Sequence, residues 1–427
     1  MQAAVPASSS SDPARDAPLN HALEALDPTS PAIPAAPPQT QTAMVAGQEL
    51  TVFVESPPLF EALLKDIVGA SKRIWIEVYI FFNDPSCVRV SQALQAKARE
   101  GLDVRVFYDA LGSASTPGAF FNEMIDAGVR VHAYHSLMEG LRRFRPFTIL
   151  NRRDHRKIIV IDERIGYFGG MNLVENVQGD AREEKAQDKP TSSGWRDIHV
   201  RLVGPQQQEL AISFERSWLR AQGQKPPRRS RAYRRALQAT AATSGEEAIH
   251  FFDSGPGRRY SRAGRVFTRL IRKARHQVTL SMAYFIPVGA PMRALLNARR
   301  RGVRVRVIVP GKSDVAIVQR ASCHLYDQLL RRGFRIYERR QRMLHSKTMV
   351  VDDQYTVVGS CNLDPRSLYI NLEFLAVIRS QHFARIIARI CRFEAKNSNR
   401  VTRQSCRRQS RWQRLLDRLA WAVRWWL

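Results

Sequence analysis

Cysteine is scarce in this sequence, and the cysteines that it has follow no pattern. The 427 residues include five, which lie far apart and form no C-x-x-C pair: Cys87, Cys323, Cys361, Cys391 and Cys406. A structural zinc site or a disulfide framework requires cysteines at regular spacings. The sequence therefore predicts free, buried thiols in a reducing compartment.

Long apolar runs are also missing. No stretch reaches the roughly 18 uninterrupted apolar residues that a membrane-spanning helix requires. The start of the chain lacks the basic segment followed by an apolar segment that is typical of a signal peptide. We therefore expect a chain that is soluble or attached to a membrane surface.

Acidic residues are few compared with basic residues. There are 39 Asp and Glu against 67 Lys and Arg, which gives a formal net charge of +28. Such a charge favours an anionic polymer or an anionic membrane surface as the partner. The hydrophobic content of 44% and the length of 427 residues are sufficient for two domains with their own cores.

The chain is organised as two similar halves between two tails. Residues 1–46 hold eight of the 22 prolines and are expected to form a disordered tail rich in Pro and Ala. Short β-type runs then alternate with helical segments, which indicates the α/β class. We expect a first domain over 47–225, a basic linker over 226–244, a second domain over 245–395 and a basic amphipathic tail over 396–427.

The second half repeats the first in register. Tyr79 matches Tyr284 at an offset of 205 residues, and we interpret both as core residues. His155 matches His345 at an offset of 190 residues. The difference of 15 residues indicates an insertion in the first half, which we place near residues 136–150.

The most specific signal is a motif that occurs once in each half. Both copies read H-x-K-x4-D-x6-G-[GS]-x-N. The positions are His155, Lys157, Asp162, Gly169, Gly170 and Asn172 in the first copy, and His345, Lys347, Asp352, Gly359, Ser360 and Asn362 in the second. Two copies in register indicate one function that is built twice.

The residue types of this motif suit chemistry at a phosphate group. Side chains alternate faces along a strand, so His155 and Lys157 share one face, while Asp162 lies on the other in a supporting position. An imidazole beside an ammonium, followed by a glycine-rich turn and an Asn, can hold and polarise a phosphoryl oxygen. Two such halves around one phosphorus let one histidine attack while the other protonates the leaving oxygen.

Each histidine also needs a carboxylate that orients its second ring nitrogen. Asp197 and Glu373 begin equivalent apolar runs in the two halves. We predict that Asp197 is the partner of His155 and that Glu373 is the partner of His345. The alternative is that the aspartates of the motif cross between the halves and serve the opposite histidine.

Other candidate residues receive a structural interpretation or a lesser role. His199 and His250 lie in apolar strands and are expected to be packed histidines. Asp109, Gly112 and Ser113 follow a predicted strand and are candidates for the mouth of the site.

The two H-x-K-x4-D copies resemble the phospholipase D superfamily. Within it, the segments "FYDALGS", "GWRDIHVRLVGP" and "NLDPRSLYINLE" are similar to bacterial cardiolipin synthases of the short, soluble type, over about residues 48–395. The resemblance implies two pseudo-symmetric α/β/α sandwich domains that share one active-site cleft. It also implies transfer of a phosphatidyl group through a phosphohistidine, without a metal or another cofactor. Gly170 departs from the family, which often has Ser at this position.

The resemblance further implies a reaction between two phosphatidylglycerol molecules, which gives cardiolipin and glycerol. The expected partner is an anionic phospholipid membrane, at the cytoplasmic face of the bacterial inner membrane, and no nucleic acid is expected. The oligomeric state stays open. The alternatives are a hydrolase that makes phosphatidic acid, a nuclease of the same superfamily and an inactive lipid-binding scaffold.

The pattern of residues over Arg411–Leu427 predicts an amphipathic helix. Its apolar stripe consists of Trp412, Leu415, Leu416, Leu419, Val423 and Trp426, with arginines on the opposite side. A helix rich in Trp and Arg is typical of segments that lie flat at a lipid interface. The alternative is a helix that packs on the protein or on a partner.

Overall fold

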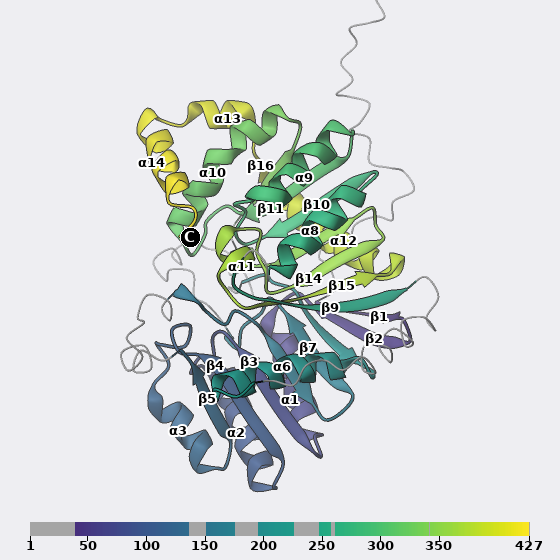
Figure 1. Ribbon diagram of the computed structural model, residues 1–427, viewed down its shortest axis with the longest axis vertical. Coiled ribbons are helices and arrows are strands. Elements are labelled where there is room, and N and C mark those ends of the chain that lie inside the picture. The colour runs from purple at the N-terminus through teal and green to yellow at the C-terminus, as the bar shows by residue number, and fades with distance from the viewer. Residues whose placement is uncertain are drawn as a thin grey trace, which may run out of the picture. The chain divides into compact units, whose positions relative to one another are not determined.

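Eight strands of the first half form one mixed sheet in the computed structural model, which describes residues 39–135, 151–175, 195–225, 247–257, 261–340 and 342–426 (Figure 1). The strands are β1 (Thr40–Val45), β2 (Gln48–Phe53), β3 (Arg73–Val78), β4 (Asp103–Asp109), β5 (Arg130–Tyr134), β6 (Ile158–Ile161), β7 (Ile165–Gly169) and β8 (His199–Val203). Their order in the sheet is β1-β2-β8-β7-β6-β3-β4-β5.

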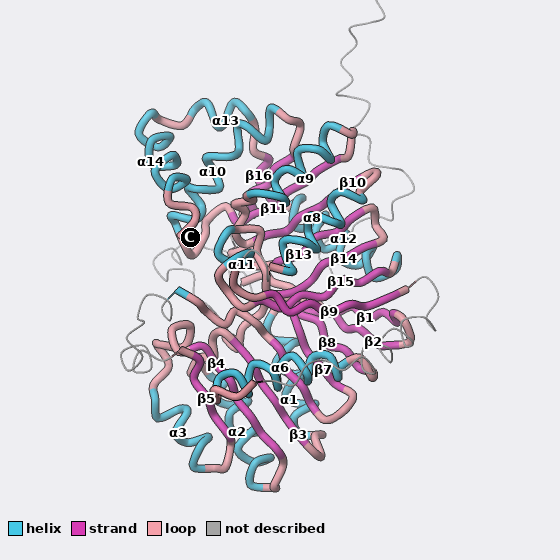
Figure 2. Tube along the Cα trace, in the orientation of Figure 1, coloured by secondary structure: helices cyan, strands magenta, loops and turns pink. Residues whose placement is uncertain are grey.

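The second half forms another eight-stranded sheet, which shares the order of seven strands with the first (Figure 2). Its strands are β9 (Ala248–Ser254), β10 (Gln277–Met282), β11 (Arg304–Pro310), β12 (Arg335–Arg339), β13 (Lys347–Val351), β14 (Tyr355–Gly359), β15 (Glu373–Arg379) and β16 (Ser398–Arg400). The order is β16-β12-β11-β10-β13-β14-β15-β9, so seven strands from β9 to β12 repeat the order from β2 to β5. The repeat in the sequence is therefore a repeat of the fold.

Helices cover both faces of each sheet, as the α/β/α expectation requires. The first half has α1 (Ser56–Val68), α2 (Pro85–Arg99), α3 (Gly118–Asp126) and α6 (Gln207–Ala221). The second half has α8 (Arg262–Lys273), α9 (Gly289–Arg300), α10 (Ala316–Arg331), α11 (Pro365–Tyr369), α12 (Gln381–Lys396), α13 (Arg403–Arg408) and α14 (Arg411–Ala422). Leu63 of α1 and Phe267 of α8 lie in separate cores on the outer faces of the two sheets. None of the helices in the described part of the chain is long and apolar enough to cross a bilayer.

A third core joins the two halves. It contains Phe214 of α6 and Phe383 of α12 together with residues of both sheets. The ring of Phe251 on β9 lies 5.2 Å from that of Phe168 on β7 and 5.5 Å from that of Phe374 on β15. Burial of large aromatic rings is strongly stabilising, so this core holds the two halves together, and the described residues belong to one compact unit over 38–427.

The motif strands lie in the middle of their sheets. Every residue of β6 and of β13 is buried. Central strands that are covered on both faces consist of near-continuous apolar residues, which explains the runs "IIVI" and "TMVV" after the two lysines. The lysine of each copy therefore lies at or directly before the start of a fully buried central strand, with the histidine two residues before it.

Two expected boundaries need correction. The predicted tail over 1–46 ends too late, because β1 begins at Thr40 and pairs with β2 through alternating buried residues such as Ala43. The tail over 396–427 also begins inside the fold, because β16 pairs with β12. Residues 1–38, the expected insertion at 136–150 and the expected linker at 226–244 lie outside the described residues, and the domain limits stay a prediction.

Candidate active site

The two motif histidines are held by backbone pairing with the opposite half. Asp154 forms an isolated β-bridge with Leu372, and the backbone N–H of His155 donates to the carbonyl of Leu372 at 3.0 Å. In the same way the N–H of His345 donates to the carbonyl of Arg196 at 2.7 Å. Each histidine therefore lies beside the residue that immediately precedes the carboxylate of the other half.

The carboxylates consequently pair with the histidines in a crossed manner. Nδ1 of His155 lies 3.2 Å from Oε2 of Glu373, and Nδ1 of His345 lies 2.6 Å from Oδ2 of Asp197. The predicted pairing within each half was wrong. In the sheet β7 lies between β6 and β8, so Asp197 begins a strand about 10 Å from that of His155.

The two lysines meet between the halves. Lys157 and Lys347 are both buried. Nζ of Lys157 donates to the carbonyl of His155 at 2.7 Å, and Nζ of Lys347 donates to the carbonyl of His345 and also lies 3.4 Å from Oδ2 of Asp197. Burial and the nearby charge of Lys347 lower the pKa of Lys157 to about 7, and burial also lowers the pKa of Lys347. Two cations that repel each other in a buried site favour an anion between them.

The histidines are held in their neutral form in the free protein. Burial and the charges of Lys157 and Lys347 lower the pKa of His155 well below its ordinary value. Burial and Lys347 also lower the pKa of His345, but the hydrogen bond with Asp197 works against them. If Nδ1–H of each ring donates to its carboxylate, Nε2 carries the free lone pair. The side chain of His155 is 12% exposed, which leaves it accessible to a substrate.

The pKa values of the two carboxyl groups shift in opposite directions. Burial opposes ionisation of Asp197, but Lys347 and the hydrogen bond from His345 hold its pKa below the ordinary value. Burial raises the pKa of Glu373 well above the ordinary value, because Lys157 only partly offsets it. His345 therefore has an anionic partner, while the environment of Glu373 favours the protonated, neutral form.

Gly170, where the family often has Ser, lies directly against the carboxylate of Asp197. A Cβ atom at Gly170 would overlap with the carboxylate of Asp197. At the equivalent position the hydroxyl of Ser360 donates to Oε2 of Glu373. The first half thus has no side chain where the second half has a hydrogen-bond donor.

The motif asparagines hold the turns that follow the two motifs. Oδ1 of Asn172 accepts from the N–H of Ile80, and Oδ1 of Asn362 accepts from the N–H of Tyr284, both at 3.3 Å. These bonds tie the turn after each motif to the end of the neighbouring strand. The expected role of the asparagines in binding a phosphoryl oxygen stays a prediction.

The motif aspartates lie away from the histidines, at the far ends of the motif strands. Both adopt the left-handed backbone conformation, with φ of 51° at Asp162 and 53° at Asp352. Asp162 accepts hydrogen bonds from three consecutive backbone N–H groups at 71–73, and Asp352 from three at 275–277. Asp162 and Asp352 therefore fasten the motif strand to its neighbour and do not orient a histidine, which removes the alternative of crossing aspartates.

Two aromatic side chains contact the histidines and were not predicted to do so. The ring of Tyr79 lies 5.1 Å from that of His155, with Nζ of Lys157 5.3 Å from its centroid. The ring of Trp195 lies 4.6 Å from that of His345. The match of Tyr79 with Tyr284 in the repeat is the sequence signal for this contact, although the sequence predicted a core position for both. Trp195 has no counterpart in the repeat that would have indicated it.

The lesser candidates have structural roles. Asp109 is fully buried, forms an ion pair with Arg153 at 3.2 Å and accepts from the N–H of Asp154 at 2.9 Å, so it supports the segment before the first histidine and does not line a mouth. Ser113 accepts from the N–H of Phe81 at 3.0 Å.

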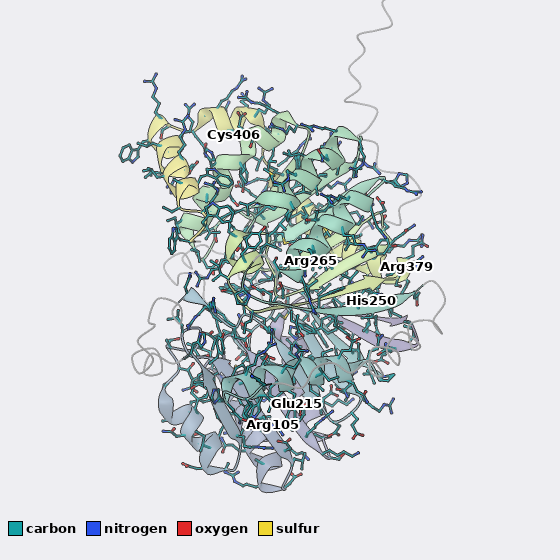
Figure 3. All side chains as sticks on the ribbon, in the orientation of Figure 1. Arg105, Glu215, His250, Arg265, Arg379 and Cys406 are labelled. Carbon is teal, nitrogen blue, oxygen red and sulfur yellow. The ribbon has the colours of Figure 1, made fainter. Side chains whose placement is uncertain are left out.

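His199 is buried, and burial lowers its pKa to about 3, as expected for a packed neutral histidine. His250, labelled on β9 in Figure 3, is exposed, so the packed interpretation was wrong there. Gly112 has a structural role, because a Cβ atom at this position would overlap with the backbone of Tyr79. Among the described residues, no group of three or more His, Cys, Asp or Glu is arranged to hold a metal ion.

Comparison with protein families matches both halves. Residues 63–184 and 267–393 match the family described as "Cardiolipin synthase, PLD-like domain". Cardiolipin synthase A of Pseudomonas fluorescens is 30% identical over 376 residues, which cover 88% of this chain and 74% of the relative. A cardiolipin synthase of Listeria monocytogenes is 32% identical over 330 residues, which cover 77% of this chain and 65% of the relative.

Solved structures show the same fold at low identity. Phosphatidylserine synthase of Haemophilus influenzae superposes with a TM-score of 0.65 at 14% identity, over 91% of this chain and 97% of that chain. Polyphosphate kinase of Porphyromonas gingivalis reaches a TM-score of 0.50 at 16% identity, over 81% of this chain and 50% of that chain. The topology of two repeated sheets is therefore that of known proteins.

Proposed function

Because the chain belongs to the cardiolipin synthase family of phospholipase D-like proteins, we propose that it joins two phosphatidylglycerol molecules into cardiolipin and releases glycerol. The family makes it a phosphatidyltransferase. The observation that supports the finer proposal is the crossed pair of histidines: the pKa of Asp197, the partner of His345, is lowered, whereas burial raises the pKa of Glu373, the partner of His155.

In the first step Nε2 of His155 attacks phosphorus, and the bond from phosphorus to the glycerol oxygen breaks. The lowered pKa of His155 supports this role, because an attacking imidazole must be unprotonated. Lys157 and Lys347 bind the phosphoryl oxygens and stabilise the charge that develops on them. The product of this step is a phosphatidyl group on His155.

His345 protonates the leaving glycerol oxygen in the same step. A bound phosphodiester anion favours the imidazolium form, and the carboxylate of Asp197 stabilises it at 2.6 Å. In the second step a hydroxyl of the second phosphatidylglycerol attacks phosphorus, His345 takes up its proton, and His155 leaves. One phosphodiester replaces another, so atoms and charges balance and little energy is required.

The proposal needs no metal, because this chain's own residues supply each part of the reaction. His155 is the nucleophile, His345 is the acid and base, and the two lysines supply positive charge. The same role in a metal-dependent enzyme would be filled by a bound cation. A chelator is therefore expected to leave turnover intact.

Peripheral attachment to the cytoplasmic face of the cell membrane completes the proposal. Both substrates are bilayer lipids, and the cytoplasmic leaflet carries a negative surface potential that attracts basic proteins. The net charge of +28 supports this location.

The test is incubation of the purified full chain with phosphatidylglycerol labelled in its glycerol head group, in mixed detergent micelles, with and without a chelator. We expect cardiolipin and free glycerol in equal amounts, and the same rate with the chelator. Phosphatidic acid as the sole lipid product would replace the proposal with a hydrolase. Cleavage of a plasmid at a comparable rate would point to a nuclease.

A further inference from the structure

A hollow with a strongly basic lining lies between α8 and α9, far along the chain from the motif residues. Its volume is about 690 Å³. Five of the side chains that line it are cationic, and no described residue in its wall is acidic: Arg265, Arg269, Arg272, Lys273 and Arg293. Tyr369 and Trp425 line the same hollow. We name it the α8–α9 groove; Arg265 marks its position in Figure 3.

The cations of the groove come from two helices and point at one space. Arg265, Arg269 and Arg272 follow helical spacing on the outer face of α8, while Phe267 and Ile271 on its inner face are buried. A basic face that is merely exposed to water would explain the arginines of α8 taken alone. It does not explain why Arg293 of α9 and two aromatic rings line the same hollow.

Several of these cations lack a counter-charge in the described part of the protein. Arg269, Arg272, Lys273 and Arg293 form no salt bridge with any described residue, although many other arginines of this half do, such as Arg339 with Glu394 at 2.7 Å. Like charges around one hollow repel each other, so an anion in the groove is favoured.

The terminal helix α14 exposes its apolar side. One side of it rests on α10: Asp417 pairs with Arg320 at 3.3 Å, Ala420 is buried, and Trp421 stacks on His324 at 5.5 Å (Figure 1). The side chains that follow one another along the outer side are exposed by 41–72% and form what we name the α14 stripe: Trp412, Leu415, Leu419, Val423 and Trp426.

An amphipathic helix on a soluble protein normally turns its apolar side inward. Here the helix packs on α10 and still leaves large apolar side chains in water, which is typical of an interaction surface. Arg411, Arg414 and Arg418 of the same helix are exposed as well. Apolar side chains beside arginines fit the boundary between lipid head groups and acyl chains.

The groove and the stripe are continuous. Trp425, which directly precedes Trp426 of the stripe, lines the groove, and its ring lies 6.2 Å from that of Tyr369 on α11. The guanidinium of Arg424 lies 4.4 Å from the centroid of Trp421 and 5.8 Å from that of Trp425. Arg366 of α11 donates to the carbonyl of Trp426 at 3.4 Å. The end of the chain is therefore fixed next to the groove.

We propose that the α8–α9 groove and the α14 stripe form one docking surface for an anionic phospholipid bilayer. The cations of the groove bind lipid phosphates, and the stripe inserts between head groups and acyl chains. A nucleic acid would match the groove but not the exposed Trp and Leu side chains. The proposal rests on the proposed function only in that the substrates are bilayer lipids.

Sedimentation of the full chain with vesicles of phosphatidylcholine, with and without phosphatidylglycerol, tests the surface. The groove variant is Arg269→Glu with Arg272→Glu, and the stripe variant is Leu415→Ser with Leu419→Ser. The control is Arg300→Glu with Arg385→Glu, which changes the net charge equally at exposed sites outside the groove. Circular dichroism shows that each variant is folded.

We expect the groove variant to bind anionic vesicles at least about 30-fold more weakly, because each basic residue at an anionic surface contributes about a factor of five. The stripe variant should bind both kinds of vesicle more weakly, and its remaining tryptophans should lose the blue shift of fluorescence on vesicle addition. The control should change binding by no more than about threefold. The soluble head group glycerophosphoglycerol should not displace the protein from vesicles, which separates a lipid surface from a free phosphate ligand.

Equal vesicle binding by all variants overturns the proposal. So does loss of affinity for a DNA or RNA oligonucleotide in the groove variant while its vesicle binding is unchanged. The kcat for saturating phosphatidylglycerol in detergent micelles is measured in parallel and should be the same in all variants, because neither the groove nor the stripe contains a reacting group. A full chain that binds vesicles but forms no cardiolipin in micelles would reject the proposed function and leave the docking surface standing.

Discussion

The two histidine–carboxylate pairs occupy equivalent positions in the two halves, yet the pKa values of their carboxyl groups shift in opposite directions. His345 pairs with Asp197, whose pKa is lowered by Lys347 and His345 in spite of burial. His155 pairs with Glu373, whose pKa burial raises. A neutral histidine suits attack on phosphorus, and a histidine beside an anion suits proton transfer. A repeated site can thus perform two roles because its carboxylates differ.

The cause of the difference lies in a few neighbouring atoms. Each lysine donates to the backbone carbonyl of its own histidine, and Lys347 also reaches the carboxylate of Asp197 at 3.4 Å. Gly170 leaves room for Asp197, while Ser360 donates to Glu373. Each of these contacts can be changed by one substitution, and the two halves then serve as controls for each other.

Removal of either histidine should give the largest effect. His155→Ala and His345→Ala are each expected to lower kcat for phosphatidylglycerol by about 10⁴-fold or more, since both steps need both groups. The two variants should separate on a phosphodiester with a nitrophenol leaving group, which needs no acid. His345→Ala should then release a burst of nitrophenol and accumulate a phosphoenzyme visible by mass spectrometry, and His155→Ala should do neither.

The control for this prediction is His250→Ala, because His250 is exposed on β9 and should leave turnover unchanged. A phosphoenzyme trapped with His155→Ala but not with His345→Ala would reverse the two roles.

Neutralisation of the carboxylates should give unequal effects. Asp197→Asn removes the anion that supports protonated His345, so kcat should fall by about 10²–10⁴-fold. Glu373→Gln places a neutral group where burial already favours the protonated carboxyl group, so kcat should fall by less than about tenfold. Steady-state kinetics in micelles measures both, with melting temperatures as a check on folding. Equal losses would mean that both carboxylates act as anions.

Substitution of Gly170 and Ser360, which contact the two carboxylates, should have a smaller effect on kcat. Gly170→Ser places atoms where the carboxylate of Asp197 lies and displaces it from His345, so kcat should fall by about 10²-fold. Ser360→Gly removes one hydrogen bond to Glu373, which corresponds to about fivefold. If Gly170→Ser has full activity, the space at Gly170 is not what positions Asp197.

Much of the fold and of the site could be predicted from the sequence, because its signals were local or repeated. Asp162 has the supporting position that was predicted for it, although it lies beyond the end of β6, and the repeat predicted two sheets, which share the order of seven strands. The motif spacing identified the histidines and lysines that lie together. These features depend on residues that are close in sequence or on two copies of one pattern.

The pairing of the carboxylates could not be predicted in this way. It depends on β7 lying between β6 and β8, and on backbone bonds between halves such as His345 to Arg196. No local pattern reports either fact. The contacts of Tyr79 and Trp195 with the histidines likewise arise only when the halves meet.

The last expected effect concerns pH and compares the two lysines. A lysine is a cation below its pKa and neutral above it, and the pKa of Lys157 in the free protein is lowered to about 7. The cation that binds substrate is therefore lost as pH rises through about 7. Since kcat/KM reports the free enzyme, it should fall by about tenfold by pH 8, while kcat stays level because a bound phosphate raises the pKa. The pKa of Lys347 is also lowered, but its salt bridge with Asp197 supports the charge.

Lys157→Arg keeps a charge at every pH and should remove the alkaline fall in kcat/KM, whereas Lys65→Arg, on the exposed side of α1, should leave it in place. An unchanged fall in Lys157→Arg would assign it to another group and make the two lysines equivalent.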